Sequence, residues 1–321
     1  MGRVEWGEMG TLLIALAAML WGSDLLFRPV VLASGWSAAR VVLAEHLLLT
    51  ALFAGSLWAG RRALAALTTT QWSLLLFIAW GGSALATWLY TQAFTLGSPL
   101  PAILLQKTQP LFALLLAGCV LRERRTRGFW LWCALALAGA YALTGITTLP
   151  SCHDLRWQQA ACALGAAALW GAATVAGRLL SPCLLPVTLA GARFALALPP
   201  LALICLLTSS KDGMATLHTG GNWHAWALLG LIVLLPDWLG MGFYYAGLRG
   251  TPASVATLAE LCYPLTALII GVAVQGTHLT PWQWAGLALL AGSVMRLGVR
   301  PDVQSNARDT PSNLLPNVGQ A

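Results

Sequence analysis

The sequence predicts an all-α integral membrane protein with ten transmembrane helices, arranged as two inverted five-helix repeats. Three observations favour this fold class. The 321 residues are 58% hydrophobic and only 9% charged, whereas soluble globular chains carry about 25% charged residues. Apolar runs of the length that crosses a bilayer, roughly 20 helical residues, follow one another along the chain. Short motifs of the first half also recur in the second half.

Ten apolar runs are expected to span the membrane, and many are joined by short turns that contain Gly, Pro or Ser. They are residues 10–30, 37–59, 72–96, 99–121, 128–148, 157–180, 184–208, 223–248, 252–274 and 281–299. The first run is long enough to remain as a span, so no cleavable signal is expected. Residues 301–321 are rich in Asn, Pro, Ser and Asp and are expected to form a disordered cytoplasmic tail.

The basic residues predict the orientation of the chain. With the N-terminus in the cytoplasm, twelve arginines fall on the cytoplasmic side, and only Arg156 and Lys211 fall in the opposite loops. Lys and Arg are enriched on the cytoplasmic side of membrane proteins. Both termini are therefore predicted to be cytoplasmic, in a multi-pass protein of a bacterial inner (cell) membrane. The net charge of +7 follows from this topology, and no nucleic-acid partner is expected.

Recurring motifs divide the chain into two halves, 1–150 and 151–300. Leu20-Trp21-Gly22 recurs as Leu169-Trp170-Gly171, each in the first span of its half. Arg40 in the second span likewise has a counterpart in the seventh span, Arg193. Because each half has five spans, the second half must enter the membrane upside down relative to the first. Many secondary transporters are built in this way, with the binding site near the midplane between the repeats.

Two prolines at equivalent positions, Pro110 and Pro264, are expected to break their helices at the depth of this site. A proline cannot donate to the carbonyl four residues earlier. It therefore frees the carbonyl groups of Gln106 and Glu260, which also carry polar side chains. Interrupted polar helices in corresponding places indicate a transport site. The alternative is a pair of structural kinks whose polar groups satisfy one another.

Lys107 is the sharpest candidate for substrate binding, since its ammonium group is expected near the middle of the membrane. It could hold a substrate carboxylate or repel protons from a neighbouring acid. The alternative is an ion pair with Glu45 or Asp237. Gln106 and Gln109 could hydrogen-bond an amino or amide group of the substrate, or they could bond to a neighbouring helix.

Two further acids are candidates for the site. Asp237 could bind an ammonium group or carry a coupling proton, or it could be ionised and structural beside Arg193 or Lys107. Asp24 stands four residues before Arg28 on one helix face, so that this pair needs no function. Glu260 completes the set of candidate acids.

Aromatic residues on the expected cavity spans favour flat, apolar or cationic substrates. Seven lie there: Trp21, Trp88, Tyr90, Trp238, Tyr244, Tyr245 and Tyr263. All except Tyr245 belong to the predicted substrate-binding set.

Several segments together resemble the drug/metabolite transporter superfamily, specifically the EamA-type ten-span exporters. They are LWGSDLLFRPV (20–30), LWGAATVAGRLL (169–180), WLYTQAF followed by PAILLQKTQPLFALLLAGCVLRE, and FYYAGLRGTPASVATLAELCYPLTALIIG. The resemblance covers residues 10–300. It implies a central cavity lined by spans one to four and six to nine, with spans five and ten at the periphery. It also implies efflux of small metabolites, usually amino acids.

Two departures from the family pattern stand out. Glu123 matches an acid that the family commonly has at the end of the fourth span, but the equivalent place after the ninth span reads Gln275-Gly276-Thr277-His278. Glu260 stands four residues before its proline, whereas many relatives have the acid next to the proline.

The predicted function is export of small metabolites by alternating access. Amino acids are the favoured substrates, and aromatic or neutral ones are considered within that class. Transport could be a uniport or a proton antiport. The alternatives are export of another small solute or a cationic drug, an intramembrane enzyme, or a lipid-handling protein. The sequence lacks GxSxG, HExxH and DxxD motifs and Cys–His pairings, so no enzyme activity, cofactor or metal is expected. The expected partners are the small-molecule substrate and the lipid bilayer, with the protein as a monomer or homodimer.

Overall fold

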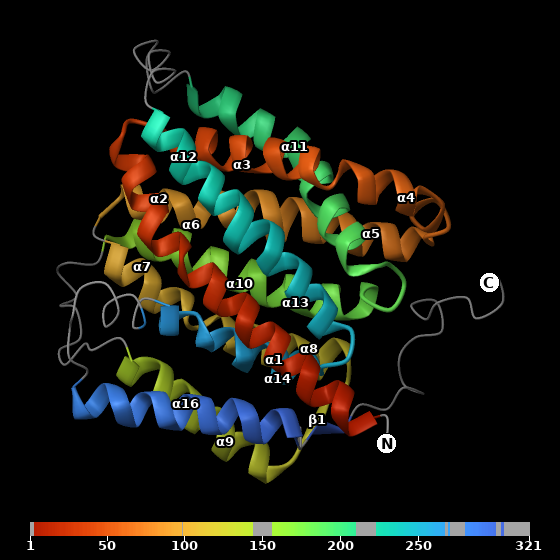
Figure 1. Ribbon diagram of the computed structural model, residues 1–321, viewed down its shortest axis with the longest axis vertical. Coiled ribbons are helices and arrows are strands. Elements are labelled where there is room, and N and C mark those ends of the chain that lie inside the picture. The colour runs from red at the N-terminus through yellow and green to blue at the C-terminus, as the bar shows by residue number, and fades with distance from the viewer. Residues whose placement is uncertain are drawn as a thin grey trace.

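The computed structural model describes residues 3–97, 99–143, 156–209, 223–266, 269, 280–299 and 303–304. Helices dominate these residues, and they run roughly along one common direction (Figure 1). The elements before residue 150 are α1 (Arg3–Gly22), α2 (Asp24–Ala33), α3 (Ala38–Leu52), α4 (Ala54–Ala65), α5 (Thr69–Phe77), η1 (Ile78–Leu85), α6 (Ala86–Thr95), α7 (Pro99–Gln106), α8 (Gln109–Val120), β1 (Arg124–Arg125) and α9 (Arg127–Leu143). The elements after it are α10 (Trp157–Leu180), α11 (Pro186–Ser209), α12 (Trp223–Ile232), η3 (Val233–Gly240), α13 (Met241–Leu248), α14 (Ala253–Ala259), η4 (Glu260–Cys262), α16 (Pro281–Val299) and β2 (Val303–Gln304).

Among the described residues, six helical runs have the length and apolar composition needed to cross a membrane. They are Met9–Ala33, Thr69–Thr95, Pro101–Val120, Trp157–Leu180, Pro186–Thr208 and Trp223–Leu248. A seventh results if the bent pair α3–α4 is one span, and α9 is a shorter apolar helix. These helices have the character of a multi-pass membrane protein. The last residues of the expected span 252–274, beyond 266 and apart from 269, lie outside the described part of the chain.

The expected span 37–59 is divided at Phe53, where the chain bends by 76° between α3 and α4. The cause is packing against α11, which contacts both pieces. A Cβ on Gly191 of α11 would lie 2.8 Å from Phe53 Cβ, and a Cβ on Gly60 of α4 would lie 2.3 Å from Thr188 Cγ2. The absence of these two side chains lets α11 approach both sides of the bend.

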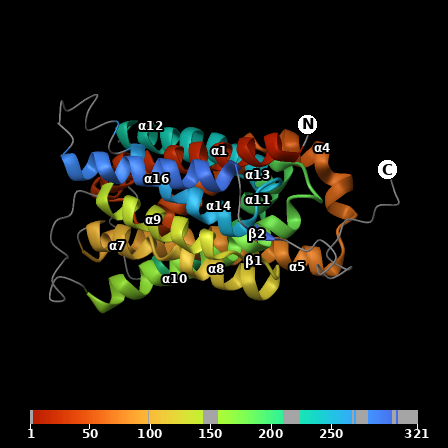
Figure 2. The same cartoon turned by 90° about the horizontal axis from the view of Figure 1, so that it is seen from below.

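Helices of the two halves pack in reciprocal pairs (Figures 1 and 2). The first helix of each half lies among helices of the other half: α1 packs against α13 and η3, and α10 packs against α6, α7 and α8. In the same way α3 packs against α11, and α9 packs against α16. In the last pair a Cβ on Gly139 would lie 2.7 Å from the Leu290 backbone nitrogen. Small residues permit this close approach of helices in membranes.

Regular α-helix is interrupted at several places in the described part of the chain. The π-helical segments η1 and η3 interrupt the helical runs Thr69–Thr95 and Trp223–Leu248. The turn at Lys107–Thr108 separates α7 from α8, and α14 tightens into the 3₁₀ segment η4. Pro110 lies in the first turn of α8, where its missing N–H leaves no hydrogen bond unmade. Such irregular segments are frequent at functional sites.

A short antiparallel ladder joins the segment after α8 to the end of the chain. Arg124 pairs with Gln304, and Arg125 pairs with Val303. Two residues of the stretch expected to be disordered, 301–321, thus form a strand, and the other residues of that stretch lie outside the described part of the chain.

Candidate functional site

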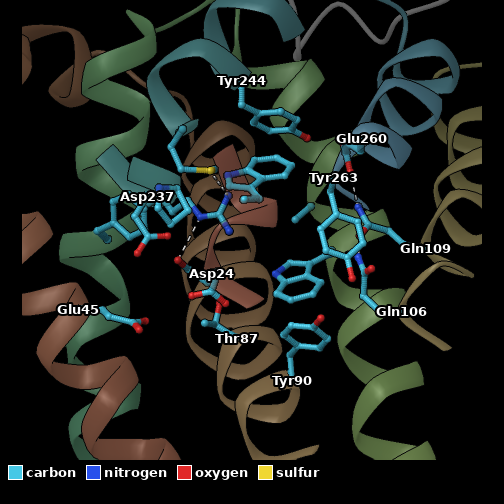
Figure 3. Close-up of a pocket in the computed structure, with 18 of the residues that line it drawn as sticks. Asp24, Glu45, Thr87, Tyr90, Gln106, Gln109, Asp237, Tyr244, Glu260 and Tyr263 are labelled. Carbon is cyan, nitrogen blue, oxygen red and sulfur yellow. Dashed lines mark hydrogen bonds between the residues drawn. The ribbon is translucent and has the colours of Figure 1, made fainter. Parts of the chain in front are cut away.

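A cavity lies between the two halves and encloses about 160 Å³ accessible to the centre of a water molecule. Figure 3 shows its walls, with the acids Asp24, Glu45 and Asp237 on one side and the amides and Glu260 on the other. The lining residues from the first half are Trp21, Asp24, Leu25, Arg28, Glu45, His46, Ser83, Thr87, Tyr90, Gln106 and Gln109. Those from the second half are Trp170, Ala173, Thr174, Arg193, Phe194, Pro236, Asp237, Met241, Tyr244, Glu260 and Tyr263.

One wall of the cavity is organised around Arg28. Its Nε donates to Asp24 Oδ2 at 2.6 Å, and its Nη1 lies 3.0 Å from Glu45 Oε1. Nη1 also donates to Thr91 Oγ1 at 3.0 Å. Arg28 is 4% exposed and Glu45 is 1% exposed, so water contributes little to the stability of these charges. The charges are retained in this apolar setting because they pair with one another.

Asp237 reaches the same wall from η3, directly after Pro236. The structure records no hydrogen bond or close ion pair of its carboxylate with any described residue. Asp24 and Glu45 already share Arg28, so this wall carries three acids around one arginine. Asp237 is therefore available to a cationic or hydrogen-bond-donating group in the cavity.

Arg193 holds η1 and α13 together at the back of this wall. It donates to Ser83 Oγ at 3.1 Å, to the Gly82 carbonyl at 3.0 Å and to the Tyr245 hydroxyl at 3.3 Å. Ser83 Oγ also lies 3.0 Å from His46 Nε2, and His46 Nδ1 lies 2.8 Å from the Val42 carbonyl. Because that carbonyl can only accept, Nδ1 carries the proton and Nε2 accepts from Ser83. The network fixes η1 relative to α3 and α11.

The opposite wall carries a row of hydrogen bonds that converge on Glu260. Gln106 Nε2 donates to Gln109 Oε1 at 2.7 Å, and Gln109 Nε2 donates to Glu260 Oε2. From the other side, the Tyr244 hydroxyl donates to Thr174 Oγ1 at 2.9 Å, and Thr174 Oγ1 donates to Glu260 Oε1 at 3.2 Å. The row joins the broken helix α7–α8 to η4, α10 and α13. Both oxygens of Glu260 thus accept.

Aromatic rings form the remaining walls of the cavity. Trp21 and Tyr244 lie with ring centroids 5.1 Å apart, and Tyr90 and Trp170 lie 5.1 Å apart. Tyr263 stands between the amide row and Tyr90 in Figure 3. These contacts have the geometry of favourable aromatic pairs. The cavity therefore offers apolar ring faces together with polar groups at two ends.

Lys107 faces a separate, smaller chamber beside the cavity. Its Nζ is buried without a hydrogen-bond acceptor among the described residues and lies 4.2 Å from the centre of the Tyr263 ring. Gln106, Gln109, Glu260 and Tyr263 line both the chamber and the cavity. The suggested partners Glu45 and Asp237 line the cavity and not the chamber.

Nine of the twelve predicted substrate-binding residues line the cavity: Trp21, Asp24, Tyr90, Gln106, Gln109, Asp237, Tyr244, Glu260 and Tyr263. Trp88 and Trp238 do not line it, and Trp238 is 40% exposed on the outside of the bundle. For Trp88 the reason is helical geometry. Thr87 and Tyr90 are three residues apart and share the helix face that lines the cavity, so Trp88 points from a different face. The third exception is Lys107 in its chamber.

Several lining residues were not in the predicted set, although the sequence carries signals for some of them. Trp170 is the counterpart of Trp21 in the repeated Leu-Trp-Gly motif. Arg28, Glu45 and Arg193 are charged residues inside expected spans, and such residues usually face the interior of a bundle. Thr174 stands four residues after Trp170 in α10, a spacing that places both on one helix face, and it reaches the site because α10 lies against α8 and α13.

Comparison with known proteins places the chain among transporters. A model of the EamA-like transporter family matches residues 8–145 and again residues 158–298. The chain is 32% identical over 307 residues to the riboflavin transporter ImpX of Fusobacterium nucleatum subsp. nucleatum, covering 90% of this chain and 97% of that protein. It is 24% identical to the uncharacterized transporter YwfM of Bacillus subtilis, covering 94% of this chain and 97% of that protein.

A solved crystal structure also shares the fold, with a TM-score of 0.66 at 17% sequence identity over 91% of this chain and 96% of the other. The two family matches together span nearly all of the described helices. The resemblance to the drug/metabolite transporter superfamily is thereby confirmed, as are the all-helical fold and the multi-pass membrane character. The chain belongs to the EamA-like transporter family.

Proposed function

We propose that this protein carries riboflavin, or another flat heteroaromatic compound with an amide-type edge, across the cell membrane by alternating access. The observation that carries the proposal is the cavity between the halves, which combines aromatic ring faces with the fixed amide row Gln106–Gln109. Its similarity to a protein named as a riboflavin transporter supports the same substrate class.

The chemistry of the two ends of the cavity fits such a substrate. The ring system of riboflavin is flat and can stack between Trp21, Tyr90 and Trp170. Its pyrimidinedione edge alternates carbonyl acceptors with an N–H donor, which is complementary to a primary amide such as that of Gln106. Its ribityl chain carries several hydroxyl groups, which can donate to the unpaired carboxylate of Asp237.

The alternating-access mechanism rests on an inverted repeat of two halves, 1–150 and 151–300, each with five spans. Two separate matches to the family model, at 8–145 and 158–298, support this division. The reciprocal packing of α1 with α13 and of α10 with α8 also supports it. Rocking of one half against the other around the cavity would expose the substrate to each side in turn.

The proposed location is a bacterial inner membrane with both termini in the cytoplasm. The distribution of arginines supports this orientation. In the structure, Arg125 and Arg178 lie at the same end of the bundle, where α8 and α10 end and α14 begins. The direction implied by the family resemblance is export.

Counterflow in proteoliposomes tests the function. Vesicles that contain the purified protein are loaded with unlabelled riboflavin, and labelled riboflavin is added outside in trace amounts. A carrier accumulates the label transiently, and protein-free vesicles do not. Vesicles loaded with amino acids, aromatic ones included, provide the comparison, because amino acids were the class expected from the sequence. Accumulation with amino acids and none with riboflavin would overturn the proposed substrate.

A matched pair of tryptophan variants tests the site. Trp21 lines the cavity, whereas Trp238 lies outside it. An aromatic contact contributes about 0.5–1.5 kcal/mol beyond area burial, so Trp21→Ala should weaken riboflavin binding by roughly threefold to tenfold. Trp238→Ala should leave the affinity unchanged. Equal effects of the two variants would contradict the proposed location of the ring.

A further inference from the structure

The small chamber beside the cavity contains polar groups that lack a partner. Within the part of the chain that the structure describes, Lys107 Nζ and Thr257 Oγ1 are buried and have no hydrogen-bond partner. Both residues line the chamber, and Thr257 is 0% exposed. The chamber provides about 10 Å³ to the centre of a water molecule, close to the smallest space that holds one water. One water there would accept from Lys107 and donate to Glu260.

Glu260 occupies the boundary between the chamber and the substrate cavity, and it lines both. The other cavity acids, Asp24, Glu45 and Asp237, do not line the chamber. Glu260 is therefore the carboxylate that solutes can reach from the cavity, while Lys107 lies on its other side, in the chamber. Its two oxygens accept from Gln109 and Thr174.

We propose that Glu260 binds the proton that couples transport to a pH gradient, and that Lys107 positions and tunes it through a water in the chamber. The proposal rests on the transport function proposed above. A hydronium ion in the cavity transfers its proton to one oxygen of Glu260 and leaves a water molecule, and that oxygen becomes a hydroxyl donor. The hydroxyl oxygen is a weaker acceptor than a carboxylate oxygen, so the hydrogen bond that it accepts from Gln109 or from Thr174 weakens. The hydrogen bonds that hold the Gln106 amide in place then weaken, and the substrate loses this fixed binding group. The proton and the substrate therefore bind alternately.

Other charged and titratable groups surround Glu260. Lys107 and Tyr263 face it beside the chamber, Tyr244 acts through Thr174, and Arg193 interacts with it electrostatically from α11. The far wall carries Arg28 with three acids: Asp24, Glu45 and Asp237. Lys107 Nζ is buried without a hydrogen-bond partner among the described residues and lines the chamber together with Glu260. Arg193 is held by Ser83, Gly82 and Tyr245, so removal of the Lys107 charge tests the tuning without breaking that network.

Proton release provides the test. Riboflavin is added to purified protein in lightly buffered detergent, and a pH-sensitive dye reports the protons released, while proteoliposomes report the effect of a pH gradient on uptake. Glu260→Gln should release no proton and should exchange riboflavin at a rate that the gradient does not change. Glu123→Gln, an acid that lines neither the cavity nor the chamber, should still release a proton and respond to the gradient.

Lys107→Met provides a second variant that keeps Glu260 in place. Loss of the cation makes proton binding easier, so the pH midpoint of proton release should move to higher pH. An unchanged midpoint in Lys107→Met, or proton release by Glu260→Gln equal to that of the original protein, would overturn the proposal. Riboflavin exchange without any proton release would overturn it too and would leave the transport function intact. Absence of exchange at every pH would instead refute the transport function.

Discussion

Removal of the Arg28 side chain should destabilise the protein strongly. Arg28 is the close ion-pair partner of both Asp24, at 2.6 Å, and Glu45, at 3.0 Å. The side chains of Arg28 and Glu45 are 5% and 1% exposed, so water cannot replace the lost partner. Breaking a buried pair by removing one member costs about 3–5 kcal/mol. Arg28→Met, which keeps much of the apolar volume, is expected to lose free energy of unfolding in this range.

The measurement is unfolding of the purified protein in mixed micelles by a denaturing detergent, followed by tryptophan fluorescence. Arg62→Met is the matched control, because Arg62 is exposed and substitutions at such places usually change stability by less than about 0.5 kcal/mol. The double variant Arg28→Met/Glu45→Gln should recover part of the loss, since it removes the uncompensated charge of Glu45. If Arg28→Met unfolds like Arg62→Met, the ion pairs of Arg28 with Asp24 and Glu45 do not stabilise the fold.

Three further predictions concern helix packing, the junction of the halves and thiol chemistry. Gly139→Ala should destabilise the α9–α16 pair because its Cβ would meet Leu290 nitrogen at 2.7 Å, whereas Gly292→Ala, with nothing within 4 Å, should be neutral or slightly stabilising in the same unfolding assay. Glu123→Gln should lower the free energy of unfolding by about 1–2 kcal/mol in that assay. The buried Glu123 carboxylate accepts from the backbone nitrogens of Ala253 and Ser254 at 2.9 and 3.0 Å, and such charge-assisted bonds are stronger than neutral ones. An unchanged unfolding midpoint would contradict this prediction. Burial raises the pKa of the Cys183 thiol between α10 and α11, so less thiolate is present at a given pH. Alkylation of a variant whose only cysteine is Cys183 should therefore reach half its maximal rate at a pH above about 8.5, the usual pKa of a cysteine thiol.

The junction at Glu123 gives a physical meaning to a feature visible in the sequence. Glu123 matches the acid that the family commonly carries at the end of the fourth span. In the structure it accepts hydrogen bonds from the first residues of α14, and Arg125 donates to Ser254 Oγ beside it. Backbone N–H groups at a helix start lack partners within the helix. An acid from the first half thus accepts hydrogen bonds from the free N–H groups at the start of a helix in the second half.

From the sequence alone follow the membrane class of this protein, its family and nine of the 22 residues that line the cavity. Hydropathy reports these features directly, since every span must be long and apolar. A polar residue retained inside such a span faces the interior, which is why Gln106, Asp237 and Glu260 could be chosen before their surroundings were known. The repeated Leu-Trp-Gly motif likewise carried the position of Trp170, although only its counterpart Trp21 was chosen.

The pairing of polar groups between helices follows from the packing of the helices and not from the sequence. An ion pair of Lys107 with Glu45 or Asp237 is the alternative that the sequence leaves open, but Glu45 pairs with Arg28, and Lys107 faces a chamber of its own. Residue spacing along one helix predicts local pairs such as Asp24 and Arg28, but it does not predict pairs between helices. The bend at Phe53 was hidden for the same reason, because it arises from the surface of α11 against which α3 and α4 pack.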